Sequence, residues 1–501
     1  MSEDSKADRS ARRLSRRNFA AGVLAGTAAG AGASLLGPGT AHAQSPSAAA
    51  RNATRAARSS ASSSASCTQI PNRYDEPFEV CDDELFIFMA NYKPFEVEGF
   101  FDTVIGRKLA AAFPDVTFKV AAWDKPIRYE DLTAAGVVPD IVIEDPRRRI
   151  DRDLEPLGWL RNLTGELAEN GIDVGSLNQA AVELVKSRSD GGLYGIPLFV
   201  DDFVMLYNKK IFDRFHVAYP SHGITYDQAF RKAQRLTREE NLVAYKGYLQ
   251  HPDNYLDFNQ LGLYPFLPTG SESPAPEDVR VNITSEGWQQ LGANLERFLF
   301  IPRNIFTSVD DFFQTGHVAM AVDTLWKLNA YLLNEIYIDP EDREQYRQLA
   351  ENVDIGITSV PVLGGGDDWT YQPNCLAAFL PPQSAKRQQA LDVVKWLVSE
   401  EAQVELSRYG IKPALRSDAV VESFGSALPG FEGVDTSGVF WGENAVVHGY
   451  EQTEYWDLPL YAVFRLHVLQ DGLKASSALT VTETVDIPNY IRNQVELGFD
   501  W

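Results

Sequence analysis

Short apolar runs alternate along the chain with segments of helical periodicity. Residues 85–90 are a short continuous apolar run typical of a strand that is covered on both faces, and the runs 116–120 and 141–143 predict two further strands. Between the first two runs, apolar side chains recur every three or four residues over 101–113, which predicts a helix closed by a proline. This alternation indicates an α/β fold with a mainly parallel sheet, in which ligands bind at the carboxyl ends of the strands.

Two further helices are predicted from their caps and periodicity. The sequence Thr225-Tyr226-Asp227-Gln228 is a capping box that opens a helix over 226–236. Residues 387–409 predict one long amphipathic helix, which ends at Gly410. Residues 269–278 are rich in proline, glycine, serine and glutamate, and they predict a surface loop.

The N-terminal segment has the pattern of an export signal. Several arginines precede a stretch rich in glycine and alanine, and a small-x-small sequence predicts cleavage after Ala43. The sequence Ser15-Arg16-Arg17-Asn18-Phe19 resembles the twin-arginine signal, so residues 1–43 are interpreted as a twin-arginine signal peptide. Residues 44–83 are assigned to a flexible tether, most clearly over 44–66, where 16 residues are Ala or Ser.

Composition excludes several classes of protein. A formal net charge of −23 argues against nucleic acid as a partner, because affinity for phosphate comes from lysine and arginine. The three cysteines, Cys67, Cys81 and Cys375, are too few for a four-cysteine metal site or a disulfide-rich scaffold. A disulfide between Cys67 and Cys81 would suit an oxidising compartment, and the sequence leaves this pairing open.

Common catalytic and nucleotide-binding motifs are missing from the sequence. It contains no HExxH, no GxSxG, no Walker glycine loop and no dinucleotide fingerprint after a strand. Adjacent carboxylates such as Asp201-Asp202 point to opposite faces if they lie in a strand, so each pair offers at most one group to a site. The sequence therefore favours a binding protein over an enzyme, and it predicts no cofactor and no metal.

Three segments together resemble a known family. They are GLYGIPL followed by LYNKKIF at 192–198 and 206–212, FFQTGHVAMAVDTLW at 312–326, and the segment 355–361 followed by the helix through KWLVSEEAQ at 395–403. In this order they resemble the extracellular solute-binding proteins of ABC importers, specifically the carbohydrate-binding group that includes maltose-binding protein. The resemblance covers residues 84 to about 415.

The resemblance implies a two-lobed periplasmic-binding-protein fold of type II, with α/β lobes joined by hinge crossovers. One lobe would contain residues 84–200 and 360–400, and the other 201–359 and 401–501. It also implies a monomer in the periplasm or outside the cell, which binds a sugar and delivers it to an ABC transporter permease. Export would use the twin-arginine machinery, whereas most members of the family use the general secretory route.

The chemistry of a sugar determines which side chains a site needs. Its C–H faces stack on aromatic rings, and its hydroxyl groups pair best with charged and amide side chains. Matching positions to the family places Asn91, Lys93 and Glu144 in the first lobe, Asp201 at the crossover and Trp326 in the second lobe. Trp326 could instead be a core residue, although the ligand role is favoured. Glu144 stands where relatives often have an aromatic residue.

Further candidates follow the second crossover and lie near the C-terminus. Trp369, Tyr371 and Asn374 belong to a loop that enters a returning strand of the first lobe, and Trp441 either lines the second lobe or packs within it. Two other functions stay open. One is the binding of a cationic solute such as a polyamine, since carboxylates and aromatic rings also suit cations. The other is a secreted carbohydrate-active enzyme.

Overall fold

The computed structural model describes residues 66–71, 77–90, 94–123, 127–149, 153–186, 191–267, 278–304, 308–331, 335–364, 369–447 and 460–497. The described chain from Cys67 on belongs to one compact unit, in which each predicted lobe contains a β-sheet. The predicted signal peptide, most of the tether and most of the 269–278 loop lie outside the described residues. In the part of the chain that is described, no helix is long and apolar enough to cross a membrane.

The first lobe is built on a six-stranded sheet with the order β15-β6-β14-β5-β3-β4. Its core strands are the predicted apolar runs: β3 is parallel to β4 and to β5, and all of β5 is buried. The strands are β3 (Glu84–Ala90), β4 (Thr117–Trp123), β5 (Ile141–Glu144), β6 (Ile196–Asp201), β14 (Asn374–Phe379) and β15 (Lys412–Pro413).

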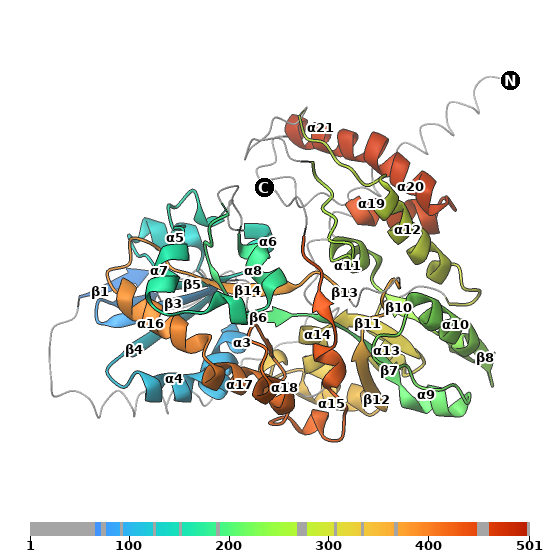
Figure 1. The fold of residues 1–501 in the computed structure, drawn as a ribbon, viewed down its shortest axis with the longest axis horizontal. Coiled ribbons are helices and arrows are strands. Elements are labelled where there is room, and N and C mark those ends of the chain that lie inside the picture. Colours follow the sequence, from blue (N-terminus) through green and yellow to red (C-terminus); the bar gives the residue numbers. More distant parts are fainter. Residues whose placement is uncertain are drawn as a thin grey trace, which may run out of the picture. The chain divides into compact units, whose positions relative to one another are not determined.

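Helices flank this sheet, as Figure 1 shows. The helix predicted over 101–113 is the later part of a longer helical segment, because α3, a π-helical turn and α4 follow one another from Pro94 to Ala112. Its apolar stripe is buried against the first core. The helices of this lobe are α3 (Pro94–Gly99), η1 (Phe100–Ile105), α4 (Gly106–Ala112), α5 (Tyr129–Ala134), α6 (Pro146–Arg149), α7 (Thr164–Glu169), η3 (Val174–Ser176), α8 (Gln179–Val185), α16 (Arg387–Leu397) and α17 (Glu400–Arg408).

Three sequence predictions for this lobe need correction. The sheet is mixed, because β14 runs antiparallel to both of its neighbours. The helix predicted over 387–409 is two helices, because Ser399 turns out of helical geometry and its hydroxyl accepts a hydrogen bond as the N-cap of α17. The first core also extends past residue 400, since Ala402, Leu406 and Ala414 are buried in it, so these residues pack with the first lobe rather than the second.

The second lobe is built on a four-stranded sheet with the order β10-β11-β7-β12. Strand β7 lies antiparallel to β11 and β12, and its side chains alternate between two cores, with Phe203 and Met205 on one face and Val204 and Leu206 on the other. The strands are β7 (Phe203–Asn208), β10 (Leu249–Gln250), β11 (Met320–Thr324) and β12 (Ile355–Ser359).

Helices cover both faces of this second sheet. The predicted capping box is confirmed, because the hydroxyl of Thr225 accepts the N–H of Gln228 and the Gln228 side chain accepts the N–H of Thr225. The helices are α9 (Lys209–Arg214), α10 (Tyr226–Leu236), α11 (Pro252–Asp257), α12 (Glu286–Leu299), α13 (Asp311–Thr315), α14 (Leu325–Tyr331), η4 (Glu335–Tyr337), α15 (Arg343–Ala350), α18 (Asp418–Ser423), η5 (Pro429–Phe431) and η6 (Ser437–Phe440).

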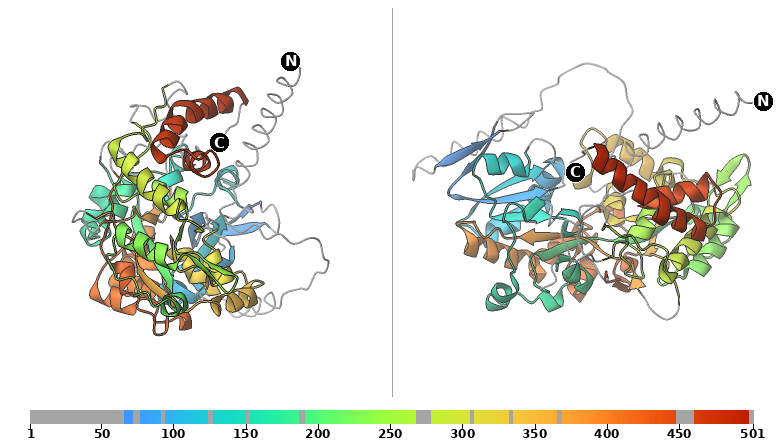
Figure 2. Two further views of the ribbon diagram at one scale, coloured as in Figure 1. Left: turned by 90° about the vertical axis from the view of Figure 1, so that its right-hand side faces the viewer. Right: turned by 90° about the horizontal axis from the view of Figure 1, so that it is seen from above.

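The C-terminal helices belong to the second lobe. Figure 2 shows them in red: α19 (Leu460–Leu469), α20 (Ala475–Val481), the π-helical turn η8 (Thr482–Asp486) and α21 (Ile487–Leu497). Helix α20 approaches α12 closely at Gly292, where an added Cβ would lie 3.1 Å from Leu479 and 3.2 Å from Ala475. A glycine at this position therefore lets the two helices pack together.

Short two-stranded pairs complete the structure. The pair β8 (Arg238–Glu240) and β9 (Val243–Tyr245) forms a hairpin, and β13 (Trp369–Thr370) runs parallel to β16 (Glu443–Asn444). Strands β1 (Cys67–Ile70) and β2 (Phe78–Cys81) are antiparallel, and Cys67 and Cys81 form a disulfide. The tether predicted to reach residue 83 therefore gives way to paired strands from Cys67 on. The third cysteine, Cys375, is buried and free.

One histidine links the C-terminal helices through two ion pairs. The Nδ1 atom of His467 lies 2.8 Å from Asp471, and its Nε2 atom lies 2.7 Å from Asp486 in η8. Burial lowers the pKa of His467, but hydrogen bonds to Asp486 and Asp471 outweigh burial and raise it above the usual value. Only the imidazolium form can donate at both nitrogens, so the doubly bonded arrangement requires the charged ring.

We therefore expect the stabilising contribution of His467 to depend on pH. Because the folded pKa is raised, the contribution is fully present below about pH 6.5 and is lost as pH rises through the folded pKa. Replacing His467→Gln should lower the free energy of unfolding by about 2 kcal/mol at pH 6 and by less at pH 9. Denaturant unfolding of both proteins across this range measures the difference, and a difference that stays constant with pH would contradict the assignment.

Candidate functional site

The chain passes from the first sheet to the second within three residues. Strand β6 ends at Asp201 and β7 begins at Phe203, so Asp202 alone separates the two sheets. The start of helix α14 is bound to this crossing, because the N–H of Trp326 donates to Oδ1 of Asp201 at 2.8 Å and the N–H of Leu325 donates to the carbonyl of Asp202 at 2.8 Å. Two residues predicted to bind the solute, Asp201 and Trp326, are thus held side by side.

Trp326 is more exposed than a core tryptophan. Its exposed fraction is 36%, whereas Trp288 in the second core is 1% exposed. The indole lies 6.3 Å from the ring of Tyr337, in η4, with the two ring planes inclined to each other. This position supports the predicted ligand role over the alternative of a core residue.

The carboxyl group of Asp201 has an unusual acidity. Burial raises its pKa to about 7, the charges of Asp323 and Asp202 act in the same direction, and the hydrogen bond from Trp326 opposes them. The neighbouring Asp323 also has a raised pKa because it is buried, although Lys327 lies 3.3 Å from it. Near neutral pH, Asp201 therefore exists partly as the acid, which can both donate and accept a hydrogen bond.

Tyr337 and Glu96 adjoin this group, and sequence analysis missed both. Glu96 is buried in α3 of the first lobe. Burial raises the pKa of Tyr337, and the charges of Asp201 and Glu96 raise it further, which places the phenol near carboxylates of the first lobe. Neither residue belongs to a motif, and the two come near each other where α3 contacts η4.

Asn374 lies beside the crossing as well. It opens β14 and stands opposite Asp201 in the register of β14 with β6.

Trp369, another predicted site residue, lies in β13, and 43% of it is exposed. Of the predicted residues, the structure brings Asp201, Trp326 and Asn374 together, whereas Asn91 and Lys93 lie outside the described residues.

Three other predicted site residues are engaged in packing or in buried hydrogen bonds. Glu144 is fully buried, and it accepts the hydroxyl of Tyr129 at 2.8 Å and the N–H of Asp145 at 2.9 Å. Trp441 packs over Gly223, where an added Cβ would lie 2.4 Å from the indole. Tyr371 is the third, and none of the three presents its ring or carboxylate as openly as Trp326 does.

Tyr371 lies in the second core. Its exposed fraction is 0%, its hydroxyl lies 2.5 Å from that of Tyr226, and Gln250 donates to it. Its ring packs 5.2 Å from that of Phe203. These contacts indicate a structural role, which the sequence could not distinguish from a ligand role because both use an aromatic ring next to a strand.

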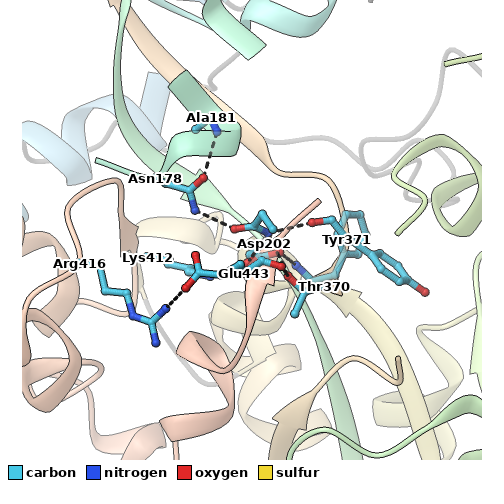
Figure 3. A network of polar contacts seen from close by, with 10 residues as sticks. Asn178, Ala181, Asp202, Thr370, Tyr371, Lys412, Arg416 and Glu443 are labelled. Atoms are coloured by element: carbon cyan, nitrogen blue, oxygen red, sulfur yellow. Dashed lines mark hydrogen bonds and ion pairs between the residues drawn. The ribbon is translucent and has the colours of Figure 1, made fainter. Parts of the chain in front are cut away.

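Asp202, the residue between β6 and β7, lies within a second group of polar residues (Figure 3). Its carboxylate accepts hydrogen bonds from Lys412 and from Asn444. A cavity of about 180 Å³ lies next to this group and is lined by residues 177–179, 412–414 and 442–444 among others. The Asp201-Asp202 pair is visible in the sequence, but only Asp201 is predicted to have a role.

The described residues offer no convincing metal site. Among them, only Cys67, Glu79 and Cys81 gather closely enough to hold an ion, and the two cysteines are joined in a disulfide. Thiolates, rather than disulfide sulfurs, bind metals.

Comparisons with known proteins place the fold in context. The model of the family described as bacterial extracellular solute-binding protein matches residues 106–404. No curated protein sequence matches the chain.

Several solved structures resemble the chain over most of its length. ABC substrate-binding protein Lmo0181 from Listeria monocytogenes, in complex with cycloalternan, is 17% identical with a TM-score of 0.54, over 83% of this chain and 99% of that one. The cyclic alpha-maltosyl-1,6-maltose binding protein from Arthrobacter globiformis is 15% identical with a TM-score of 0.57, over 81% and 98%. UgpB from Mycobacterium tuberculosis, in complex with glycerophosphocholine, is 14% identical with a TM-score of 0.54, over 83% and 99%. This likeness confirms the two-lobed type II fold.

The acidity of Asp201 gives a testable effect on stability. Between about pH 4 and pH 7 the folded protein holds the proton of Asp201 and the unfolded chain does not, so the contribution of this group to stability falls as pH rises. Asp201→Asn removes the titration, while its amide oxygen can still accept the Trp326 N–H. We expect the variant to gain stability relative to the parent as pH rises through this window. Thermal melts from pH 4 to pH 8 measure the difference, and parallel curves would show that Asp201 has an ordinary pKa.

Proposed function

The chain belongs to the family of bacterial extracellular solute-binding proteins, and we propose that it captures a carbohydrate between its two lobes and delivers it to the permease of an ABC importer. The observation that carries this proposal is the joint position of Trp326 and Asp201. A partly exposed indole and a carboxyl group that both donates and accepts hydrogen bonds are the two elements that a sugar requires.

The position of this pair also suits a protein that closes on its solute. The hydrogen bond between the Trp326 N–H and Asp201 links helix α14 of the second lobe to the end of a strand of the first lobe. A solute that contacts both residues therefore contacts elements of both lobes. We expect Asn374 to add an amide to this site, because it lies opposite Asp201.

Two of the similar structures support the choice of solute class. The Listeria protein is in complex with cycloalternan and the Arthrobacter protein binds cyclic alpha-maltosyl-1,6-maltose, and both compounds are carbohydrates. We propose that this chain binds a solute of the same class. Asn91, Lys93 and Trp369 remain proposed contacts, and so do Glu144, Tyr371 and Trp441, although each of these three would have to leave its present packing or hydrogen bonds.

Export follows from the proposed role. We propose that the twin-arginine machinery recognises residues 1–43 and that the protein acts outside the cytoplasmic membrane as a monomer without catalytic activity. A secreted carbohydrate-active enzyme is the alternative to this proposal. Release of reducing sugar from oligosaccharides during incubation with the protein would favour that enzyme.

A cationic solute is the second candidate, and the carboxylates near Trp326 favour it. Asp201, Asp323 and Glu96 place three acidic groups around the proposed site. UgpB, which shares the fold, is described with glycerophosphocholine, a compound that carries a quaternary ammonium group. Aromatic rings and carboxylates together bind such cations well.

A thermal-shift screen tests the proposal. Four compounds would be added separately to the purified protein: the linear sugar maltotetraose, a second sugar that is a cyclic tetrasaccharide, spermidine, and glycerophosphocholine. A solute at about 100 times its Kd adds about 2.7 kcal/mol of stability, which gives a clear rise in Tm. A rise with a saccharide supports the proposal, and a rise only with spermidine or glycerophosphocholine favours the cationic alternative.

Replacing Trp326 tests the site within that function. Trp326→Ala should weaken calorimetric binding of the saccharide found in the screen by about thirtyfold, the usual cost of removing a buried stacking ring, and should change the Tm of the free protein little. Phe300→Ala is the matched control, because Phe300 is another partly exposed aromatic of the second lobe, at the end of α12, and should bind normally. Full affinity in Trp326→Ala would show that the indole is not part of the site.

A further inference from the structure

Asp202 is a buried carboxylate whose oxygen atoms are both occupied. Its exposed fraction is 3%, and Oδ1 accepts the N–H of Phe203 at 2.8 Å. Oδ2 accepts Nζ of Lys412 at 2.5 Å and the amide of Asn444 at 3.0 Å. Lys412 is itself buried, so this ion pair is withdrawn from water on both sides.

The partners of Asp202 come from separate parts of the chain. Lys412 lies in β15, at the edge of the first sheet. Asn444 lies in β16, where its amide nitrogen also donates to the carbonyl of Tyr371, just after β13, and its amide oxygen accepts the amide of Asn178 at 2.8 Å. The group therefore joins the crossing from β6 to β7, the segment between β13 and β14 that returns to the first sheet, and Asn178 of the first lobe.

The same crossing residue also holds the second lobe. The carbonyl of Asp202 accepts the N–H of Leu325, the first residue of α14. Helix α14 carries Trp326 as its next residue. Asp202 is therefore bound through its side chain to the first lobe and through its backbone to the helix that carries the proposed stacking residue.

Direct hydrogen bonds join the elements around the adjacent cavity. This space of about 180 Å³ is lined by parts of 177–179, 412–414 and 440–444. Beside it, the N–H of Asn178 donates to the carbonyl of Ala414 at 2.7 Å and the side-chain amide of Asn178 donates to Asn444. A buried ion pair is weak evidence for stability, because a well-packed apolar pair of similar volume is often as stable, but in some proteins such a pair specifies one conformation.

We propose that the ion pair of Asp202 with Lys412, together with Asn444, sets the arrangement of the two lobes, which makes Asp202 a positioning residue for solute binding. The predicted change in affinity rests on the proposed function. The predicted change in the arrangement of the lobes does not depend on it. Removing the pair would let the crossing segments adopt more arrangements. Fewer of these would bring the faces of both lobes to one solute, and the apparent affinity would fall.

The first experiment measures lobe arrangement without any solute. Spin labels would be attached at Ala134→Cys in α5 and Gln345→Cys in α15, which are exposed positions on the two lobes. The native cysteines do not interfere, because two form the disulfide and Cys375 is buried. Pulsed electron paramagnetic resonance then gives the distribution of distances between the lobes.

The key variant is the neutral double replacement Asp202→Asn with Lys412→Met. Each single change leaves one buried charge without its partner and should destabilise the protein, whereas the double change removes both charges and should restore much of the Tm. We expect the double variant to fold and to show a broader distance distribution than the parent. A distribution identical to that of the parent would overturn the proposal and leave the pair with a role in stability alone.

A matched control uses a second ion pair at the same place. Arg416 and Glu443 pair at 2.8 Å on the rim of the cavity, but both side chains are more than half exposed, so Glu443→Gln should leave the distribution unchanged. An equal broadening in Glu443→Gln would show that any change at this place loosens the lobes, and it would overturn the special role of Asp202.

Titration with maltotetraose adds the functional measurement. We expect the double variant to bind about fivefold to a hundredfold more weakly than the parent, within the range of ordinary coupling between distant sites. If the parent does not bind maltotetraose or any other saccharide of the screen, the proposed function fails. The distance measurement, which needs no solute, then still decides this inference.

Discussion

The tight crossing from β6 to β7 is the constraint on which the arrangement of this protein depends. A single residue separates the two sheets, so the end of one strand fixes the start of the other. The same residues receive the first N–H groups of α14, which would otherwise lack partners at a helix start. One short segment thus binds backbone N–H groups at the start of α14, joins the two lobes and positions the partly exposed Trp326.

Much of the fold could be predicted from the sequence, because strong local patterns determine it. The apolar runs that became β3, β4 and β5 and the capping box of α10 have periods and caps that tertiary packing did not override. The helix break at Ser399 was missed because an apolar stripe continues across it, and only the cap geometry reveals the new start. The antiparallel β14 could not be predicted, since the direction of a strand depends on which neighbours it meets.

The candidate site was less predictable for a related reason. Asp201 and Trp326 lie in segments with recognisable motifs, and the structure places them in contact. Tyr371 and Glu144 have the right chemistry, yet burial gives each of them partners inside one lobe. Lys412, Asn444 and Tyr337 carry no local pattern, because their significance depends on residues more than a hundred positions away.

The position of β14 within the first sheet has a consequence for biosynthesis. This strand lies between β5 and β6, but it is synthesised after the whole second sheet, and β15 follows later still. While the ribosome produces the second lobe, the first therefore has an open edge on each of these two strands, where another chain could pair. Completion of the first sheet therefore depends on contacts between residues far apart in sequence, which form slowly, and it requires synthesis to have passed β15.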